Sequence, residues 1–509
     1  MSDNQELRVR KLNHYAAVDS GQYVLYWMTA FRRPFYNFAL QRAVAYARNL
    51  HKPLLILEAL RCDYAHASDR LHRFVLQGMA ANAEHFAATA ASYYPFVETA
   101  KGAGKGLLEK LAESACLVVT DDHPGFFYPN MLQSAAAKVS VLLEAVDSNG
   151  LLPLRAADHD YPTAYAFRRF LQKTLPGYLF DFPLADPLQA ARLPRLASVA
   201  TEIQQRWPAA TDELLRAEPT ILARLPIDHS VATIDDQGGW REAESYLQRF
   251  LDQRLPFYLQ RSEPEWQVSS ELSPYLHFGQ ISTHQIVQQL FELENWSSGN
   301  LSPEARGKRS GWWGLSEAAE SFLDELITWR EIGFNTAWFR PNYDHFDSLP
   351  GWARETLAKH RDEPRSHIYA LEQFEQAQTH DPLWNAAQNQ LLREGRIHNY
   401  LRMLWGKKIF EWSPDAETAM QMMLTLNDKY ALDGRDPNSI SGIFWCLGRY
   451  DRPWGPERPV FGKIRYMTSE NTARKFSVKK YLQRYAKVGN EFIWLNGPSL
   501  GKLCDFLGL

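Results

Sequence analysis

The chain has 509 residues, and its 56 Lys and Arg against 59 Asp and Glu give a formal net charge of -3. A composition of 45% apolar and 23% charged residues is ordinary for a globular protein and excludes global disorder. No apolar run reaches the roughly 18 residues of a membrane span, and the start of the chain, MSDNQELRVRKL, has no apolar core of the kind a secretory signal contains.

The first part of the chain alternates short apolar runs with helical patterns. The apolar runs predict buried strands over residues 23–28, 53–60, 116–120 and 139–145. Apolar positions at i, i+3 and i+4 spacing predict helices over residues 37–50 and 67–91. Strands that alternate with helices indicate a parallel sheet covered on both faces. We therefore expect a Rossmann-like α/β domain over residues 1–184.

The rest of the chain has a different pattern. Residues 185–239 contain proline-punctuated stretches such as DFPLADPL and RLPRL, which indicate an interdomain connector. Beyond this connector the periodicity predicts helices over residues 242–254, 282–294, 316–337, 383–411 and 416–430. No long alternating segment interrupts them, so we expect an all-α domain over residues 240–509.

Cysteine usage limits the chemistry and the compartment. The four cysteines lie far apart and form no C-x-x-C pair: Cys62, Cys116, Cys446 and Cys504. We therefore expect neither a disulfide framework nor a metal site. A reducing compartment fits this usage, so we expect a cytoplasmic protein that does not contact a membrane.

The aromatic content of the chain and a basic segment near its end each allow two interpretations. The 16 Trp, 27 Phe and 23 Tyr make up 13% of the chain, which indicates either a large aromatic core or side chains that stack on a planar ligand. Residues 447–487 carry eleven Lys and Arg against three acidic residues, with aromatic residues between them. Such a segment can neutralise phosphates and stack on exposed bases, or it is a solvated basic face without a partner.

A line of indoles is the first candidate for chemistry. Trp405 and Trp412 lie seven residues apart in a helical pattern, hence on one face, and Trp384 comes about 21 residues before the first of them. Such indoles either relay single electrons to a redox cofactor or form a seam between helices.

Further residues suggest a cofactor site. Arg402 and Asp433 are opposite charges in apolar surroundings, which indicates either a buried ion pair or a cationic donor to an electron-rich ring. Ser269, Ser270 and Ser273 come just before a helix, where hydroxyl and N–H groups either bind phosphate or cap the helix.

A carboxylate beside an indole is another candidate. Glu325 and Trp329 lie at i and i+4, which suits a hydrogen bond to a base edge or an interior pairing with arginine. No zinc motif, P-loop, G-x-S-x-G or G-x-G-x-x-G stands in a convincing context. Their lack argues against hydrolases, kinases and nicotinamide-dependent dehydrogenases.

Several motifs in combination are far more specific. They are THDPLWNAAQ (379–388), YLRMLWGKKIFEW (400–412), LNDKYALDGRDPN (426–438), ERPVFGKIRYM (457–467) and SPYLHFGQIS (273–282). Together they closely resemble the class II DNA photolyases. The resemblance is strong over residues 240–485 and much weaker over the first 180 residues.

The resemblance implies a fold, a cofactor and a reaction. It implies an α/β antenna domain joined to an all-α domain that binds FAD. Reduced flavin, excited by blue light, donates an electron to a cyclobutane pyrimidine dimer that is flipped out of the duplex. The expected partner is therefore UV-damaged DNA. We expect the protein to be a monomer and, if the source is bacterial, to be associated with the nucleoid. A folate or a deazaflavin is the antenna chromophore that the resemblance allows, and the choice stays open.

The resemblance also assigns roles to particular residues. The residues expected to bind FAD are Tyr258, Ser269, Ser270, Leu272, Ser273, Arg402 and Asp433. Either Asn427 or Asn438 is expected at N5 of the flavin, and Trp384, Trp405 and Trp412 are expected to reduce it. The residues expected at the lesion or the DNA backbone are Glu325, Arg261, Trp329, Asn399, Met403, Trp445, Trp454 and Arg465.

Three departures from the family pattern bear on the lesion. Arg261 is followed by Ser262 where the family carries Asn, and Asn399 stands where class II members carry Gly. Compared with the family, the segment between Trp445 and Trp454 is shorter by one residue. The segment from Trp454 to Arg465 is longer by one residue. Lesion specificity therefore stays open.

Two other functions fit the same chain less well. A cryptochrome-like photoreceptor would keep the flavin and the indoles, but we expect no signalling tail after Leu509. A photolyase for the (6-4) photoproduct would need a histidine acid at the lesion, and His398 is the nearest candidate.

Overall fold

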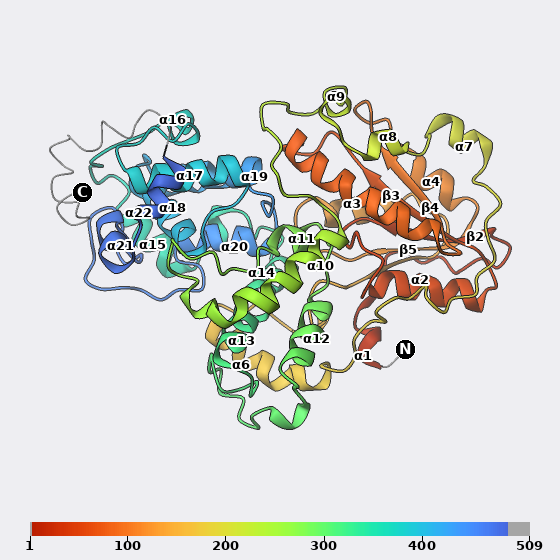
Figure 1. Cartoon of the computed structure of the whole chain (residues 1–509), viewed down its shortest axis with the longest axis horizontal. Coiled ribbons are helices and arrows are strands. Elements are labelled where there is room, and N and C mark those ends of the chain that lie inside the picture. Colours follow the sequence, from red (N-terminus) through yellow and green to blue (C-terminus); the bar gives the residue numbers. More distant parts are fainter. Residues whose placement is uncertain (1–2, 487–509) are drawn as a thin grey trace. The chain divides into compact units, whose positions relative to one another are not determined.

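The computed structural model describes residues 3–486, so Lys487 of the basic segment and Cys504 lie outside it. The chain divides into two compact units, one made of residues 1–161, 165–252 and 270–339, the other of 162–164, 253–269 and 340–509. Figure 1 shows the elements of both in sequence colours. The domain boundaries predicted at residues 184 and 240 stay predictions.

The first unit contains a six-stranded sheet in the order β1-β6-β5-β2-β3-β4. The strands are β1 (Val9–Lys11), β2 (Tyr23–Met28), β3 (Leu54–Leu60), β4 (Ser92–Val97), β5 (Ala115–Asp121) and β6 (Leu143–Val146). All neighbours pair in parallel except β1, which is antiparallel to β6. The predicted Rossmann-like α/β fold is confirmed. The strand predicted over residues 139–145 was placed too early, and β1 and β4 were not predicted.

Successive residues of β2 point to opposite faces of this sheet, as the pleat requires. Tyr23, Leu25 and Trp27 pack with α4 (Leu107–Ala112) and α5 (Tyr128–Ala136). The alternate residues Val24, Tyr26 and Met28 pack with α2 (Phe38–Asn49), which covers the other face (Figure 1). Burial on both faces explains why the central strands are uninterrupted apolar runs.

The first unit contains further helices, and three of them lie within the segment predicted as a connector, residues 185–239. The further helices are α1 (Asp3–Glu6), α3 (Asp69–Ala87), α6 (Ala164–Thr174), α7 (Thr201–Arg206), α8 (Asp212–Leu215), α9 (Pro219–Leu222), α10 (Trp240–Arg249), α11 (Ser273–His277), α12 (Thr283–Leu293), α13 (Glu317–Leu323) and α14 (Arg330–Phe339). The long helix predicted over 316–337 is interrupted by a π-helical turn, Asp324–Trp329. A second π-helical turn, Phe250–Arg254, follows α10 and leads into a 3₁₀ helix, Leu255–Gln260.

The second unit is helical. Its helices are α15 (Gly351–Lys359), α16 (Leu371–Glu375), α17 (Pro382–Glu394), α18 (Asn399–Glu411), α19 (Ala416–Tyr430), α20 (Pro437–Cys446), α21 (Ser469–Lys475) and α22 (Lys479–Tyr485). The single helix predicted over 383–411 is two helices, because Gly395 adopts a φ of 65° and ends α17. Over residues 3–486, no helix has the length and apolar character needed to cross a bilayer.

Candidate active site

Helices α18, α19 and α20 of the second unit surround a small cavity. It is lined by Leu391, Ile397, Arg402, Trp405, Asn427, Gly442, Ile443 and Cys446. A Cβ added at Gly442 would meet open space, so this glycine leaves the cavity wall clear. Of the two asparagines predicted at a flavin, Asn427 is among the lining residues, whereas Asn438 lies in the first turn of α20, where its backbone N–H is capped by Asp436.

Polar side chains in this cavity are oriented by their partners. The Arg402 guanidinium contacts both carboxylate oxygens of Asp433 at 3.2 Å, and the two side chains are 26% and 9% exposed. The Asn427 amide donates to Asp428 at 2.9 Å and accepts from the Ser439 hydroxyl at 3.2 Å. The predicted pairing of Arg402 with Asp433 is therefore present, and it places a cation at the cavity wall.

The three predicted indoles form a buried line that starts at the cavity. Trp405 lines the cavity, and its backbone carbonyl accepts from Nε1–H of Trp384 at 3.0 Å. The rings of Trp384 and Trp412 have centroids 6.3 Å apart. All three are at most 2% exposed. Gln388, which the sequence did not single out, lies one turn after Trp384 and accepts from Nε1–H of Trp405 at 2.8 Å.

The residues predicted to bind the FAD phosphates and ribityl chain are divided between the two units. Tyr258 is buried in the 3₁₀ helix with Arg261 over its ring at 4.9 Å, and the Ser269 carbonyl accepts from Arg254. These residues belong to the second unit, whereas Ser270, Leu272 and Ser273 belong to the first. There Leu272 is buried, its N–H donates to the Ser270 hydroxyl at 3.4 Å, and exposed Ser273 begins α11.

Glu325 and Trp329, predicted at the lesion, share the π-helical turn of the first unit. Both are half-buried. Arg168 holds the adjacent Asp324 by two hydrogen bonds at 2.6 and 2.9 Å, which fixes this turn. Single π-helical turns inside α-helices occur frequently at functional sites. The additional residue in the turn changes the direction in which side chains project from the helix.

A second group of predicted lesion residues lies where α18 crosses α20. The Met403 sulfur is 3.5 Å from Sγ of Cys446, which directly follows the half-buried Trp445. Lys407 donates to the Cys446 carbonyl at 2.7 Å, and burial lowers the pKa of this lysine to about 8. The ammonium therefore holds the C-terminal end of α20, where a cation is favourable. Asn399 is exposed at the start of α18.

The basic segment presents a charged surface. Two guanidinium groups lie over the ring of Trp454, that of Arg452 at 4.5 Å and that of exposed Arg465 at 5.2 Å from its centroid. Its indole N–H donates to Asp451 at 3.0 Å. Arg449 does not join this surface: it is 4% exposed, donates to the Tyr343 carbonyl, and burial lowers its pKa to about 10.

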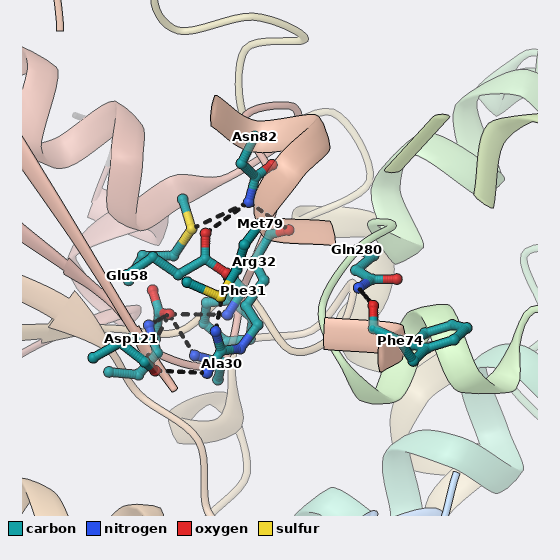
Figure 2. Close-up of polar contacts among 12 residues, drawn as sticks. Ala30, Phe31, Arg32, Glu58, Phe74, Met79, Asn82, Asp121 and Gln280 are labelled. Atoms are coloured by element: carbon teal, nitrogen blue, oxygen red, sulfur yellow. Dashed lines mark hydrogen bonds and ion pairs between the residues drawn. The ribbon is translucent and has the colours of Figure 1, made fainter. Parts of the chain in front are cut away.

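The carboxyl edge of the sheet is occupied by the chain's own polar groups (Figure 2). At the switch point between β2 and β5, where open α/β sheets bind ligands, one Asp121 oxygen accepts three backbone N–H groups of residues 29–31 at 2.7–2.9 Å. Beside it, buried Glu58 accepts from Arg32 and Asn82, each at 2.9 Å. We assign no antenna chromophore to this edge. Among residues 3–486 no group of three or more His, Cys, Asp or Glu side chains is arranged to hold a metal ion.

Comparisons with known proteins agree with one another. No family model matches the chain. Deoxyribodipyrimidine photo-lyase of Methanothermobacter thermautotrophicus is 32% identical over 95% of this chain and 99% of its own length. The protein of that name from Arabidopsis thaliana is 32% identical over 90% of this chain and 88% of its own. Cryptochrome-1 of Sinapis alba is 26% identical over only 43% of the chain. A class III photolyase structure from Agrobacterium tumefaciens has the same fold, with a TM-score of 0.65 at 15% identity, over 95% of this chain and 92% of that one.

Proposed function

This chain belongs to the family of deoxyribodipyrimidine photolyases and cryptochromes, and from that premise we propose that it is a class II type photolyase. It splits cyclobutane pyrimidine dimers in UV-damaged DNA by electron transfer from photoexcited reduced FAD, as a monomer in the cytoplasm. The observation that carries this proposal is the line of buried indoles that starts at a cavity lined by Arg402 and Asn427.

The residues around that cavity fit a flavin. Asn427, rather than Asn438, is the amide we assign to N5, and Arg402 is the cation beside the ring. Gly442 keeps one wall free of side-chain atoms. Bound FAD supplies light absorption and the transfer of single electrons. The chain's own task is to orient the ring, to keep water out and to set the charge around it, for which Asp433 neutralises part of the Arg402 charge.

The indoles give oxidised flavin a route to its reduced form. With oxidised flavin bound and excited by light, Trp405 would supply the electron that the flavin accepts. Trp384 would then reduce oxidised Trp405, and Trp412 would reduce oxidised Trp384. The contact between Trp384 and the Trp405 backbone and the 6.3 Å separation of the next pair of rings support this order. Because all three side chains are buried, their transient positive charges are protected from water.

On the DNA side, we assign two tasks to two sets of residues. Glu325 and Trp329 contact the flipped dimer from the π-helical turn, with Met403 and Trp445 packing against it from α18 and α20. Trp454 is also assigned to packing against the dimer, and Asn399 to the lesion or the DNA. The residues assigned to the DNA backbone or a base are Arg261 and Arg465. Contacts of this second kind position the duplex without reading its sequence.

The alternatives have less support. The two cryptochrome matches are 26% identical and cover 43% and 52% of the chain, while the photolyases of Methanothermobacter thermautotrophicus and Arabidopsis thaliana are 32% identical and cover 95% and 90% of it. Repair of a (6-4) photoproduct needs a protonated histidine, and burial lowers the pKa of His398 to about 4, so this side chain is neutral at pH 7.

The test compares two oligonucleotides, one with a single cyclobutane dimer and one with a single (6-4) photoproduct. Each is mixed with reduced, flavin-loaded protein under blue light. Restoration of the first substrate alone supports the proposal, and restoration of the second would reassign the lesion. No restoration of either by flavin-loaded protein would favour a photoreceptor.

A further inference from the structure

A second basic surface lies on the first unit, outside the basic segment of residues 447–487. Three residues of α6 and three of the loop over residues 302–311 make this α6–loop surface, and all six are exposed: Tyr165, Arg169, Lys173, Arg306, Lys308 and Arg309. The three on α6 lie at intervals of four, so they share one face of the helix. Helix α6 contains no acidic residue, and Glu304, the only acidic residue of the loop, pairs with Arg306 at 2.7 Å. Five cations therefore stand against one carboxylate.

A glycine brings the loop against the helix. Gly307 adopts a φ of 73°, and a Cβ at this position would lie 3.0 Å from the ring of Tyr165 and 3.3 Å from Cβ of Arg169. The loop backbone therefore touches the exposed face of α6, and the cations on either side of Gly307 lie close to Arg169. Like charges repel one another, so gathering them costs free energy that a bound anion offsets.

Buried polar side chains of α6 fix the backbone of this loop. The Gln172 amide oxygen accepts from the Gly307 N–H at 2.6 Å, and its nitrogen donates to the Lys308 carbonyl at 2.9 Å. The buried Arg168 guanidinium donates to the Gly307 carbonyl at 3.4 Å. The loop is therefore ordered before a partner binds, which reduces the entropy lost on binding.

The same arginine connects this surface to the turn assigned to the dimer. Arg168 also holds Asp324 by two hydrogen bonds, at 2.6 and 2.9 Å. Asp324 begins the π-helical turn that carries Glu325 and Trp329. One buried guanidinium therefore bonds both the loop and this turn, and all of these residues belong to the first unit. The α6–loop surface thus lies beside the turn that carries two of the proposed lesion contacts.

The chemistry of the surface fits a DNA backbone. Lysine and arginine neutralise phosphates, and a tyrosine hydroxyl donates to phosphate oxygens. From residue 165 to residue 173 the helix rises by about 12 Å, which corresponds to about three successive phosphates of one strand. The row of side chains on α6 therefore has the length to follow a strand.

We propose that the α6–loop surface binds the DNA backbone beside the lesion, as a contact with the duplex separate from the basic segment. The proposal rests on the proposed function, which supplies damaged DNA as the partner. Binding releases the counterions that accompany the phosphates. Because Arg168 ties the loop to the π-helical turn, the bound strand is held in a fixed position relative to Glu325.

The test is the salt dependence of DNA binding by the full-length, flavin-loaded protein. Fluorescence anisotropy gives the affinity for a duplex that contains one cyclobutane dimer. A triple variant combines Arg169→Gln, Lys308→Gln and Arg309→Gln, which removes three exposed charges. Each phosphate contact that is lost lowers the slope of log K against log salt by about 0.9, so we expect a decrease of up to about 2.7.

A charge-matched variant and a short substrate serve as controls. Arg192→Gln, Arg195→Gln and Arg224→Gln together remove three exposed cations elsewhere in the first unit and should leave the slope unchanged. A dimer-containing single-stranded pentanucleotide fills the lesion contacts without a flanking duplex. The first triple variant should bind it, and repair it in blue light with reduced FAD, as the wild type does.

The outcomes separate this proposal from the proposed function. An unchanged slope in the first triple variant would overturn the proposal and would favour an acidic protein as the partner of this surface. An equal decrease in the charge-matched variant would also overturn it, since net charge alone would then account for the effect. Failure of the wild type to split dimers in light would refute the proposed function, whereas a slope lowered only by the first triple variant would still locate DNA on this surface.

Discussion

Replacing Gln388 by methionine tests how the structure tunes the indole at the cavity. Gln388 is fully buried, and its amide oxygen accepts from Nε1–H of Trp405 at 2.8 Å. Methionine has a similar length and volume but no strong acceptor, so the variant leaves a buried N–H unsatisfied without opening a cavity. The change therefore acts on the polarity beside Trp405 rather than on packing.

The expected magnitude follows from the charge that Trp405 carries while it is oxidised. A hydrogen bond between neutral groups contributes about 1 kcal/mol, and one to a charged group about 2 kcal/mol. Losing the acceptor therefore disfavours oxidised Trp405 by about 1 kcal/mol, which is about fivefold in the equilibrium for its oxidation. We expect the rate of flavin photoreduction with a thiol to fall by up to about this factor. Repair by chemically reduced Gln388→Met should be unchanged.

Gln390→Met is the matched control. Gln390 is buried on the same helix, but its side chain accepts from the His398 N–H and the Tyr481 hydroxyl instead of an indole. It should lose stability to a similar degree and keep the photoreduction rate. Equal photoreduction in Gln388→Met and the wild type, or an equal loss in both variants, would refute the reasoning.

Three further changes have defined outcomes. Trp405→Phe should block photoreduction of oxidised flavin, followed by absorbance, and spare dimer splitting by chemically reduced protein. Arg465→Ala should weaken binding to damaged DNA and lower the slope of log K against log salt by about 0.9; an unchanged slope would remove this residue from the phosphate contacts. Burial raises the pKa of Glu331 from 4.5 to about 7, so the stability that its protonation contributes is full below pH 4.5 and is lost as pH rises through 7. Urea unfolding of the wild type relative to Glu331→Gln should show this decline.

Strand prediction succeeded in the middle of the sheet and failed at its edges. β2, β3 and β5 are buried on both faces, so each is an apolar run that the sequence displays directly. β4 is an edge strand that admits Pro95 and leaves Ser92 and Tyr93 half-exposed, and β1 is polar. Neither has the apolar run or the alternation that marks a strand.

The candidate site shows the same division between local and long-range information. The motifs predicted the indoles and the Arg402–Asp433 pair, because these residues lie in recognisable stretches of sequence. They did not predict Gln388 as a partner, since it contacts an indole 17 residues away and the contact depends on how α17 and α18 pack. Arg449 was counted with the basic surface because charge alone does not reveal burial.

The most direct test of the central claim is the loss of cyclobutane dimers from a UV-damaged thymine oligonucleotide. Purified protein with fully reduced FAD is mixed with the oligonucleotide, and parallel samples stand in blue light and in darkness. The account predicts that intact thymines return in the light and not in darkness. Dimers that persist in the light with flavin bound, or a chain that binds no flavin, would contradict it.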